Sequence, residues 1–339
     1  MFNNKCISID IGSQYAKCAV GTYKNNIIKI DQLILEKVPE GIIKNGMIID
    51  VDGMTDFLKS IIDKNNVKVS SISFCIFSNK VFQRELEVSI VDNDNDRKNL
   101  IAYEIEEFIP DEIENSIIQH KVIEEIDYGE TKKHKVFVAV INKNIVDQYY
   151  KVVKNLKLKP SILDIHSNTI HKLLSLNALN KVGHDFEEMN SIVLDIGHKT
   201  INACIFERSV FKFCREILSG LNHMIELTEG QSYEELKNIK YEDITIENHP
   251  QLKDEINYWL QEVNKIRRLY LSSANEIQVN KVYVCGGGAT LQFILDALKE
   301  ELEANIEVIS PLDVLDLKDS VSTEQLPLFM NAIGNLVKE

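Results

Sequence analysis

Two aspartates in this sequence are each followed two residues later by a glycine, within the tripeptide Asp-Ile-Gly. The first pair is Asp10 with Gly12, and the second is Asp195 with Gly197. Glycine lets the backbone approach a ligand closely, and successive N–H groups in such a turn bind anions such as phosphate. A carboxylate repels phosphate but binds the hydrated Mg²⁺ that accompanies it. The two tripeptides therefore predict a site for a nucleotide phosphate with magnesium.

Both tripeptides stand in the same kind of sequence, 8–20 in the first copy and 193–206 in the second. A short apolar run precedes each glycine and an alternating run follows it, which is typical of strands. Each copy is therefore expected to form a strand–turn–strand hairpin followed by a third strand. A single Asp-x-Gly is usually an ordinary turn. Two copies in matched contexts, 185 positions apart, indicate a duplicated architecture whose halves face one nucleotide.

Length and composition narrow the class of protein. The chain has 339 residues, a length that suits two domains better than a single core. Apolar residues make up 44% and charged residues 27%, as in ordinary globular proteins. The net charge of −14 argues against nucleic acid or an anionic membrane surface as the main partner. No apolar run reaches the length of a membrane span, and the N-terminus has no signal-peptide pattern.

The cysteines are scattered and none forms a Cys-x-x-Cys pair. Most lie in apolar, strand-like stretches, which favours buried reduced thiols over a zinc site. The six are Cys6, Cys18, Cys75, Cys204, Cys214 and Cys285.

The first part of the chain has the pattern of an α/β unit. Three strands are expected over 6–38, followed by a helix over 52–66 with Asp52 as its N-cap. A buried strand is expected over 69–78. Mixed strands with a covering helix predict a mixed sheet.

Residues 81–158 have a different pattern of expected helices and strands. An alternating strand, a helix over 97–110, two further strands and a helix that begins at Asn142 are expected in succession. Strand, helix, strand, strand and helix predict a small α+β insertion with a sheet of its own.

A third glycine site is expected late in the chain. Residues 281–288 have the pattern of a strand that ends in Gly286, Gly287 and Gly288, with a helix behind it. A long helix over 252–274 precedes this strand. The spacing is not the Gly-x-Gly-x-x-Gly of dinucleotide-binding folds, so a Rossmann interpretation has little support. The glycine run is nevertheless a third place where backbone can approach a ligand.

In this order of two hairpins and a glycine run, the sequence resembles the actin-like ATPase superfamily, which includes actin, DnaK-type chaperones, sugar kinases and the cell-division protein FtsA. The resemblance covers nearly the whole chain. It implies an α/β, actin-like (ribonuclease H-like) duplicated fold, with two domains around a cleft for ATP or ADP and Mg²⁺. It implies that Asp10 and Asp195 bind Mg²⁺ through water. The implied phosphate-binding residues are Gly12, Ser13, Gln14, Lys17, Gly197, His198 and Thr200, and the implied adenosine-binding residues are Arg267, Arg268, Gly286, Gly287 and Gly288.

One branch of the superfamily is most similar. The stretch 103–125 resembles the matching insertion of the PilM family of type IV pilus assembly, and 262–269 resembles that branch's E-I-R-R-S-L helix, with Lys265 and Leu269 as departures. The first connecting helix is expected over 164–176 and the last over 331–334. The implied subdomains are 1A over 1–80, completed by 325–339, and an FtsA-type 1C over 81–158. Subdomain 2A is expected over 159–218, completed by 281–324, and 2B over 219–280.

The same resemblance implies partners and location. Members of this branch are cytoplasmic and reach the inner face of the cytoplasmic membrane through partners. They bind the cytoplasmic N-terminal tail of the inner-membrane protein PilN in a groove between 1A and 1C, and an acidic run here suits a basic peptide or is simply a solvated helix face. That run is Glu104, Glu106, Glu107, Asp111, Glu112 and Glu114. Other pilus-platform proteins, assembly ATPases and self-association remain open as further partners, and no nucleic acid is expected.

A residue that activates water is hard to identify. ATP hydrolysis needs a group that orients or deprotonates water, and Asp164 is the candidate, with Asn168 second. Slow or absent turnover is therefore expected. The alternatives are a small-molecule (sugar) kinase of the same superfamily, an FtsA-like division protein and a chaperone-type ATPase. A kinase would need an acceptor-activating aspartate, and an FtsA-like protein would need a C-terminal amphipathic helix. A chaperone-type ATPase would need a long substrate-binding domain. None of these features is evident in the sequence.

Overall fold

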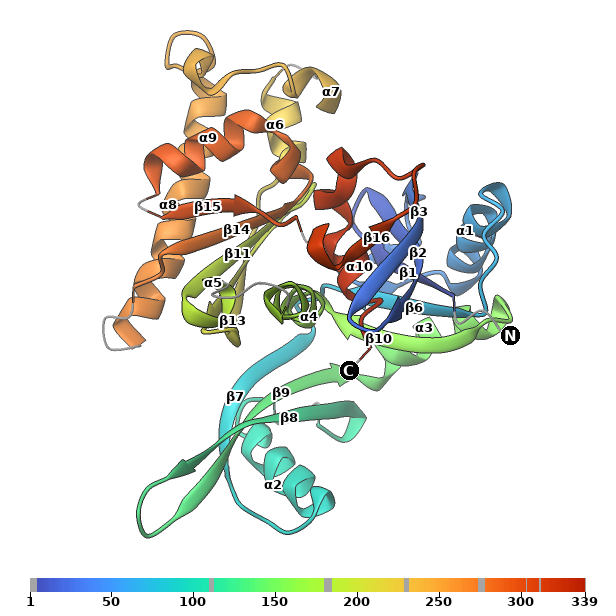
Figure 1. Ribbon diagram of the computed structural model, residues 1–339, viewed down its shortest axis with the longest axis vertical. Coiled ribbons are helices and arrows are strands. Elements are labelled where there is room, and N and C mark those ends of the chain that lie inside the picture. Colours follow the sequence, from blue (N-terminus) through green and yellow to red (C-terminus); the bar gives the residue numbers. More distant parts are fainter. Residues whose placement is uncertain are drawn as a thin grey trace. The chain divides into compact units, whose positions relative to one another are not determined.

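The computed structural model describes residues 5–109, 113–179, 185–228, 232–273, 278–302, 304–310 and 312–338 (Figure 1). The chain divides into two units. The first unit comprises Met1–Val38, Asn66–Ile76 and Ser161–Glu339, and the second comprises Pro39–Asn65 and Phe77–Pro160. Both Asp-Ile-Gly hairpins and the glycine run belong to the first unit. The subdomain boundaries expected from the sequence remain a prediction.

The first sheet of the first unit contains the N-terminal hairpin. Its six strands lie in the order β10-β6-β1-β2-β3-β16. The central strands β1, β2 and β3 form an antiparallel meander, and β6 pairs in parallel with the other edge of β1. The bounds are β1 (Cys6–Ile11), β2 (Tyr15–Lys24), β3 (Ile27–Lys37), β6 (Ser71–Ile76), β10 (Lys159–Ile165) and β16 (Leu315–Leu317). The three strands expected over 6–38 and the strand expected over 69–78 are confirmed.

The second sheet repeats this arrangement with the second hairpin. Its strands lie in the order β13-β12-β11-β14-β15, with an antiparallel meander of β11, β12 and β13 and with β14 parallel to β11. The bounds are β11 (Asn190–Ile196), β12 (Ile201–Glu207), β13 (Val210–Ile217), β14 (Lys281–Gly286) and β15 (Asn305–Val308). The strand that leads into the glycine run therefore lies beside the strand that carries Asp195.

The two hairpins agree in detail as well as in order. In each, the glycine N–H donates to a carbonyl three residues on, from Gly12 to Tyr15 and from Gly197 to Thr200, both at 3.0 Å. The second and third strands shift register after Val20 in the first copy and after Ile205 in the second. The bulge positions are separated by the same 185 residues as the two aspartates. This shared irregularity supports the predicted duplication.

Helices of the first unit cover the sheets and connect them. Trp259 of α8 and Phe293 of α9 belong to the same apolar core as Ile192 and Val284 of the second sheet. Helices α4 and α10, expected as the two connecting helices, pack against each other. The bounds are α4 (His166–Leu179), α5 (Asp185–Glu188), α6 (Leu221–Leu227), α7 (Tyr233–Leu236), α8 (Pro250–Ser273), α9 (Gln292–Glu301) and α10 (Met330–Gly334), with short 3₁₀ turns η2 (Tyr241–Asp243), η3 (Gly287–Thr290), η4 (Leu312–Val314) and η5 (Thr323–Phe329).

The second unit contains the predicted α+β insertion. A three-stranded antiparallel sheet in the order β7-β9-β8 packs against α2, with Ile101, Ile105 and Val138 in its core (Figure 1). Its elements are β7 (Val81–Ser89), α2 (Asp94–Glu106), η1 (Ile113–Asn115), β8 (Ser116–Asp127), β9 (Lys132–Asn142) and α3 (Lys143–Asn155), together with β4 (Ile43–Lys44), β5 (Met47–Ile48) and α1 (Val51–Lys64). Asn142 caps α3 as expected. The N-cap of α1 is Asp50 and not Asp52, because the Asp50 carboxylate accepts the N–H of Gly53.

Two cysteines differ from expectation. Cys204 of β12 and Cys214 of β13 are joined by a disulfide, so the expectation of six reduced thiols is wrong for this pair. The antiparallel register places the two residues directly opposite each other, which their separation of ten residues did not reveal. The other four cysteines are free and buried. No helix of the described residues is both long and apolar enough to span a membrane.

Candidate functional site

A row of polar side chains crosses the first sheet at the end of β1. Asp10 lies opposite Lys17 of β2 and opposite Cys75 of β6 in the strand registers. Directly paired residues project from the same face of a sheet. The Nζ atom of Lys17 is 3.0 Å from Oδ2 of Asp10, whose side chain is 1% exposed. The sheet therefore holds a carboxylate, an ammonium group and a thiol side by side.

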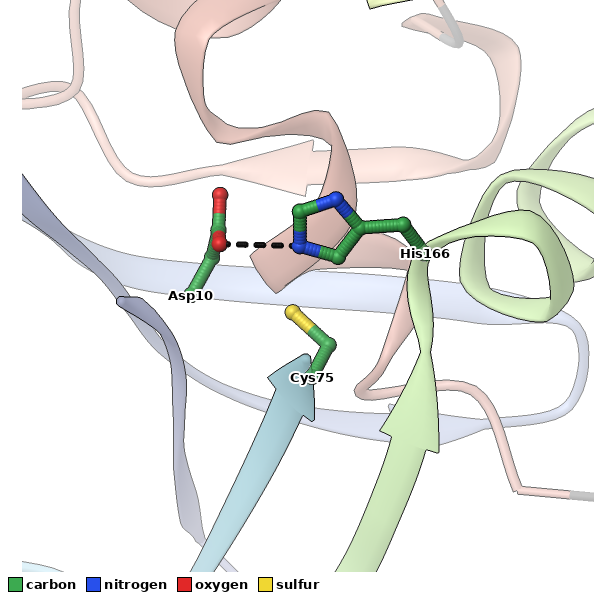
Figure 2. A group of neighbouring side chains, drawn as sticks. All are labelled: Asp10, Cys75 and His166. Atoms are coloured by element: carbon green, nitrogen blue, oxygen red, sulfur yellow. Dashed lines mark hydrogen bonds and ion pairs between the residues drawn. The ribbon is translucent and has the colours of Figure 1, made fainter. Parts of the chain in front are cut away.

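His166 adds an imidazole to this row. It is the first residue of α4, directly after β10, the strand next to β6. Its Nε2 atom is 3.0 Å from Oδ1 of Asp10, and its Nδ1 atom is 3.6 Å from Oδ2 of Asp195. Figure 2 shows the imidazole facing Asp10 with the Cys75 sulfur beside both. The carboxylates of the two hairpins thus approach the same ring from its two nitrogens, as the resemblance to a two-sided cleft implied.

Asp195 is held by the last connecting helix. Nδ2 of Asn331 in α10 donates to Oδ2 of Asp195 at 2.7 Å, and the hydroxyl of Thr169 in α4 donates to Oδ1 of Asn331 at 3.1 Å. The Asp195 side chain is 13% exposed, compared with 1% for Asp10. The residue opposite Asp195 on β12 is Asn202, where the first sheet has Lys17 opposite Asp10. The second carboxylate is therefore the more accessible and lacks a lysine across the strand.

The Asp10–Lys17 pair is ionised. Burial alone would raise the pKa of Asp10, but the charges and hydrogen bonds of Lys17 and His166 hold it well below its usual range. Burial alone would lower the pKa of Lys17, but the charges of Asp10 and Asp195 raise it well above its usual range. Lys17, which the sequence suggested for a phosphate, is therefore engaged with Asp10 in this structure.

The glycine turns have a more limited role than the sequence suggested. The N–H groups of Gly12 and Gly197 close their own turns and so are not directed at a ligand. A Cβ on Gly197 would lie 2.9 Å from the Thr200 carbonyl oxygen, so that turn requires glycine for space. Predicted phosphate contacts fall instead to the residues that follow the glycines. Of these, Ser13 is exposed at the first turn and Gln14 is half-buried.

Residues after the second glycine have partners of their own. The side chain of His198 hydrogen-bonds the side chain of Asn222, and the side chain of Thr200 hydrogen-bonds that of Glu216. Burial and the charge of Lys199 lower the pKa of His198. These residues lie at the turn as predicted, in an environment that favours a neutral imidazole.

The glycine run lies against the second hairpin. Gly286 has a φ of +80°, and a Cβ there would overlap Oδ1 of Asp195. A Cβ on Gly288 would overlap the side chain of Ile196. The hydroxyl of Tyr233 donates to the Gly287 carbonyl at 2.9 Å. The run is therefore beside Asp195, and Tyr233 joins it from α7.

Arg267 is held away from the glycine run. Arg267 donates to Oδ1 of Asn264 and to the carbonyl of Val279, each at 3.3 Å. Val279 precedes β14 and the glycine run follows it, so about 20 Å of strand separates the two ends. Because α8 runs toward the start of β14 rather than toward its end, the structure does not bring Arg267 to the glycine run. The adenosine assignment of Arg268 stays a prediction.

Asp164 is engaged in a buried network. Its carboxylate is 2.8 Å from Nζ of Lys172, and Asn168 donates to both of its oxygens at 3.0 Å. Lys172 is 4% exposed and also donates to the Val337 carbonyl. A carboxylate held in this way is poorly suited to accept a proton from water. His166, two residues later, is the residue at the end of β10 whose side chain reaches the carboxylates of Asp10 and Asp195. No sequence motif indicated this role for His166.

Two sheets of the same order, each with a glycine-turn hairpin and with their aspartates meeting at one imidazole, define the actin-like ATPase class of fold. The family model described as type IV pilus assembly protein PilM matches residues 8–335, and the chain belongs to that family. The fold and family predictions are confirmed, and membership of this family sets aside the kinase, division-protein and chaperone alternatives.

Solved structures agree with this fold. A PilM–PilN type IV pilus biogenesis complex has a TM-score of 0.77 at 19% identity and covers 98% of this chain and 97% of that chain. The ethanolamine utilization protein EutJ from Carboxydothermus hydrogenoformans has a TM-score of 0.55 at 13% identity, covering 99% and 90%. MreB 5 of Spiroplasma citri, solved with AMPPNP, has a TM-score of 0.51 at 12% identity, covering 98% and 95%. No curated protein matches the sequence.

Proposed function

We propose that this chain binds ATP or ADP with Mg²⁺ between its two sheets, and that it works as a nucleotide-dependent component of the type IV pilus platform. The observation that carries this proposal is the meeting of Asp10 and Asp195, from the two glycine-turn hairpins, at His166. A nucleotide bound there contacts both halves. It would favour whichever arrangement of the halves binds it more tightly.

Different residues of the site are assigned to the Mg²⁺ ion, the phosphates and the adenosine. Asp195, the more accessible carboxylate, and Asp10 would hold the Mg²⁺ ion through water. Backbone and side chains after Gly12 and Gly197 contact the phosphates, and the glycine run with Tyr233 faces the adenosine. When bound, Mg²⁺ neutralises phosphate charge. The carboxylate donors present suit this hard cation.

Turnover is proposed to be slow or absent. The Asp164 carboxylate is paired with Lys172 and Asn168, so the sequence-based candidate for a base is already occupied. A steady-state rate above about 1 per second, within the usual enzyme range, would contradict this.

The test is the nucleotide affinity of the purified chain with Mg²⁺. Asp195→Ala should lower ATP affinity by at least about tenfold, because it removes the accessible Mg²⁺ contact. Asp316→Ala, which removes a half-exposed aspartate of the same unit, is the matched control and should bind ATP as the wild type does. Equal ATP binding by the wild type and Asp195→Ala would reject the site.

We also propose a PilN-type tail as the partner, because a solved relative of this fold is a PilM–PilN complex. Such a tail would keep the chain in the cytoplasm at the inner face of the membrane. The end of α2 and its C-cap residue present Glu104, Glu106 and Glu107, all exposed, next to Tyr103, which is 70% exposed. Asp111 and Glu112 of the acidic run lie outside the described residues, and Glu114 is exposed. An acidic face with an exposed aromatic ring suits a basic peptide.

Peptide binding tests this partner. Reversal of Glu104, Glu106 and Glu107 to lysine should weaken binding of a PilN-tail peptide by about tenfold, since three exposed ion pairs contribute about 0.5 kcal/mol each. Reversal of Glu242, Glu247 and Glu324, three exposed acidic residues of the first unit, changes the net charge equally and is the control. Equal loss in both variants would show that only net charge matters, and no loss in either would exclude the α2 face.

A further inference from the structure

The side chains around Asp10 include donor atoms that magnesium does not favour. A carboxylate oxygen of Asp10, the sulfur of Cys75 and a ring nitrogen of His166 all lie within 4.8 Å of one another. Figure 2 shows the three side chains converging on one point from β1, β6 and the start of α4. Mg²⁺ takes oxygen ligands and water, whereas thiol and imidazole donors suit softer divalent metals.

The fold fixes these three donors independently of one another. Asp10 and Cys75 are direct partners in the parallel register of β1 and β6, so both project from one face of the sheet. His166 follows β10, the neighbouring strand. Asp10 and Cys75 are each 1% exposed, and the side chain of His166 is 13% exposed. The donors are therefore held by sheet pairing and burial, with His166 as the most exposed of the three.

We propose that Asp10, Cys75 and His166 form a binding site for a borderline-soft divalent transition metal, of which Zn²⁺ is the representative. One oxygen, one thiolate sulfur and one imidazole nitrogen are a mixed donor set that Zn²⁺ accepts at about 2.0–2.3 Å. Tetrahedral coordination places such donors about 3.5 Å apart. The three atoms, already within 4.8 Å, need only small side-chain movements to reach that separation.

The surroundings provide the outer contacts that zinc sites use. A metal-binding histidine usually directs its second ring nitrogen at a carboxylate, which fixes the ring. Here Nε2 of His166 faces Asp10, and Nδ1 faces Asp195 at 3.6 Å. Lys17 bonds Oδ2 of Asp10, whereas His166 bonds Oδ1, so a metal that replaces the Asp10–His166 contact leaves the lysine in place. Three protein ligands leave a fourth position for water or a phosphate oxygen.

Metal binding exchanges a proton for the metal. The S–H bond of Cys75 breaks, a sulfur–metal bond forms and the proton leaves to solvent, without oxidation or reduction. Burial and the charge of Asp10 raise the pKa of Cys75, so the group stays a thiol until a cation arrives. A bound divalent cation reverses that preference, because it favours the thiolate directly.

This site goes beyond the proposed function and does not depend on it. It shares Asp10 with the proposed Mg²⁺–nucleotide site, so a metal bound here changes nucleotide affinity and nucleotide changes metal affinity by the same factor. The donor cluster itself is present whether or not the chain binds ATP.

Cobalt(II) is the probe, because it replaces Zn²⁺ and reports its ligands by absorption. The full chain is stripped with chelator, and Co²⁺ is added without nucleotide. We expect one equivalent to bind with a thiolate-to-cobalt charge-transfer band in the near ultraviolet, and Zn²⁺ to remove that band by displacement. In Cys75→Ser the band should be lost. In His166→Gln the Co²⁺ affinity should fall by at least about tenfold.

The matched control is Cys18→Ser. Cys18 is also a buried free thiol, but it pairs with Ile9 and so projects from the opposite face to Asp10. It should keep the band. Absence of the band in the wild type, or its survival in Cys75→Ser, would overturn the proposal, the second result by assigning the metal to another thiol. If Cys75→Ser does not fold, His166→Gln decides, because unchanged Co²⁺ affinity in that variant also overturns the site.

Nucleotide binding is measured on the same preparation with Mg²⁺. A cobalt band in a chain that binds no ATP would reject the proposed function and leave the metal site standing. ATP binding without a cobalt band would reject the metal site and leave the proposed function standing.

Discussion

Gly334 of α10 lies against the backbone carbonyl of Thr169 in α4, so closely that a Cβ on residue 334 would overlap the carbonyl oxygen. Thr169 also donates its hydroxyl to Asn331 on α10, and Asn331 donates to Asp195. Thr169, where the two connecting helices touch, is therefore two hydrogen bonds away from a carboxylate of the site.

Replacing Gly334 with alanine should push the two helices apart. Overpacking of this kind costs about 1–3 kcal/mol, so we expect a lower free energy of unfolding by denaturant and a lower melting temperature. ATP affinity should fall as well, because Asn331 moves with α10. A melting temperature equal to that of the wild type would show that α4 and α10 are not in contact at this point in solution.

Removal of Lys17 should be far more costly than removal of a comparable lysine at the surface. Lys17→Met leaves the Asp10 carboxylate buried without its counter-ion, a loss of about 3–5 kcal/mol. Lys29→Met breaks a Lys–Asp pair between neighbouring strands of the same sheet, but both partners are 56% exposed, and about 0.5 kcal/mol or less is expected. Chemical denaturation of both variants measures the difference. Equal losses would mean that Asp10 is not buried as described.

The low pKa of Asp10 predicts an acid-sensitive contribution to stability. Its pKa in the folded chain lies below the value of 3.8 for an unperturbed aspartate, because Lys17 and His166 outweigh the effect of burial. The stabilisation is therefore fully present above about pH 4–5 and is lost as the pH falls through the folded-state pKa. Denaturation of the wild type and of Asp10→Asn from pH 7 downward checks this. The difference between the two should narrow below about pH 4, and a constant difference would contradict the assignment.

Arg267 should contribute nothing to nucleotide binding. Arg267→Ala loses contacts with Asn264 and Val279 at the far end of β14, so ATP affinity should stay within twofold of the wild type. Gly286→Ala should lower ATP affinity strongly, because the backbone φ of +80° disfavours alanine and the new Cβ would displace Asp195. Fluorescent-nucleotide titration compares the two. A tenfold loss in Arg267→Ala would restore the adenosine role suggested by the sequence.

The hairpins were predictable because their pattern is local. Alternation, a glycine and a polar turn specify strand–turn–strand without reference to distant residues, and repetition of the pattern indicated a duplicated fold. The position of Arg267 was also accessible in principle. A helix that ends only a few residues before β14 must have its last turn at the beginning of that strand, and the glycine run lies at the other end. The family motif identified the helix but not which end faces the ligand.

The cluster around His166 was not predictable, because it depends on pairing between distant strands. Asp10 and Cys75 are 65 residues apart and become neighbours through the parallel register of β1 and β6. His166 is a single histidine after a strand, with no spacing that indicates a ligand. For the same reason the scattered cysteines gave no sign of a metal site. Asp164, two residues earlier, looked more catalytic by residue type, but its buried partner Lys172 is visible only in the structure.

The single difference between Lys17 and Asn202 makes the duplicated site unequal. The first hairpin carries its own counter-ion across the strand, so its carboxylate is electrically balanced before anything binds. In the second hairpin, Asp195 lies opposite the neutral Asn202, accepts from the amide of Asn331 and shares the imidazole of His166. The first aspartate thus has a lysine as counter-ion within its own hairpin, and the second does not. Under the proposed function, a bound cation would give Asp195 the positive charge that Lys17 gives Asp10, and so would act as the missing residue of the second repeat.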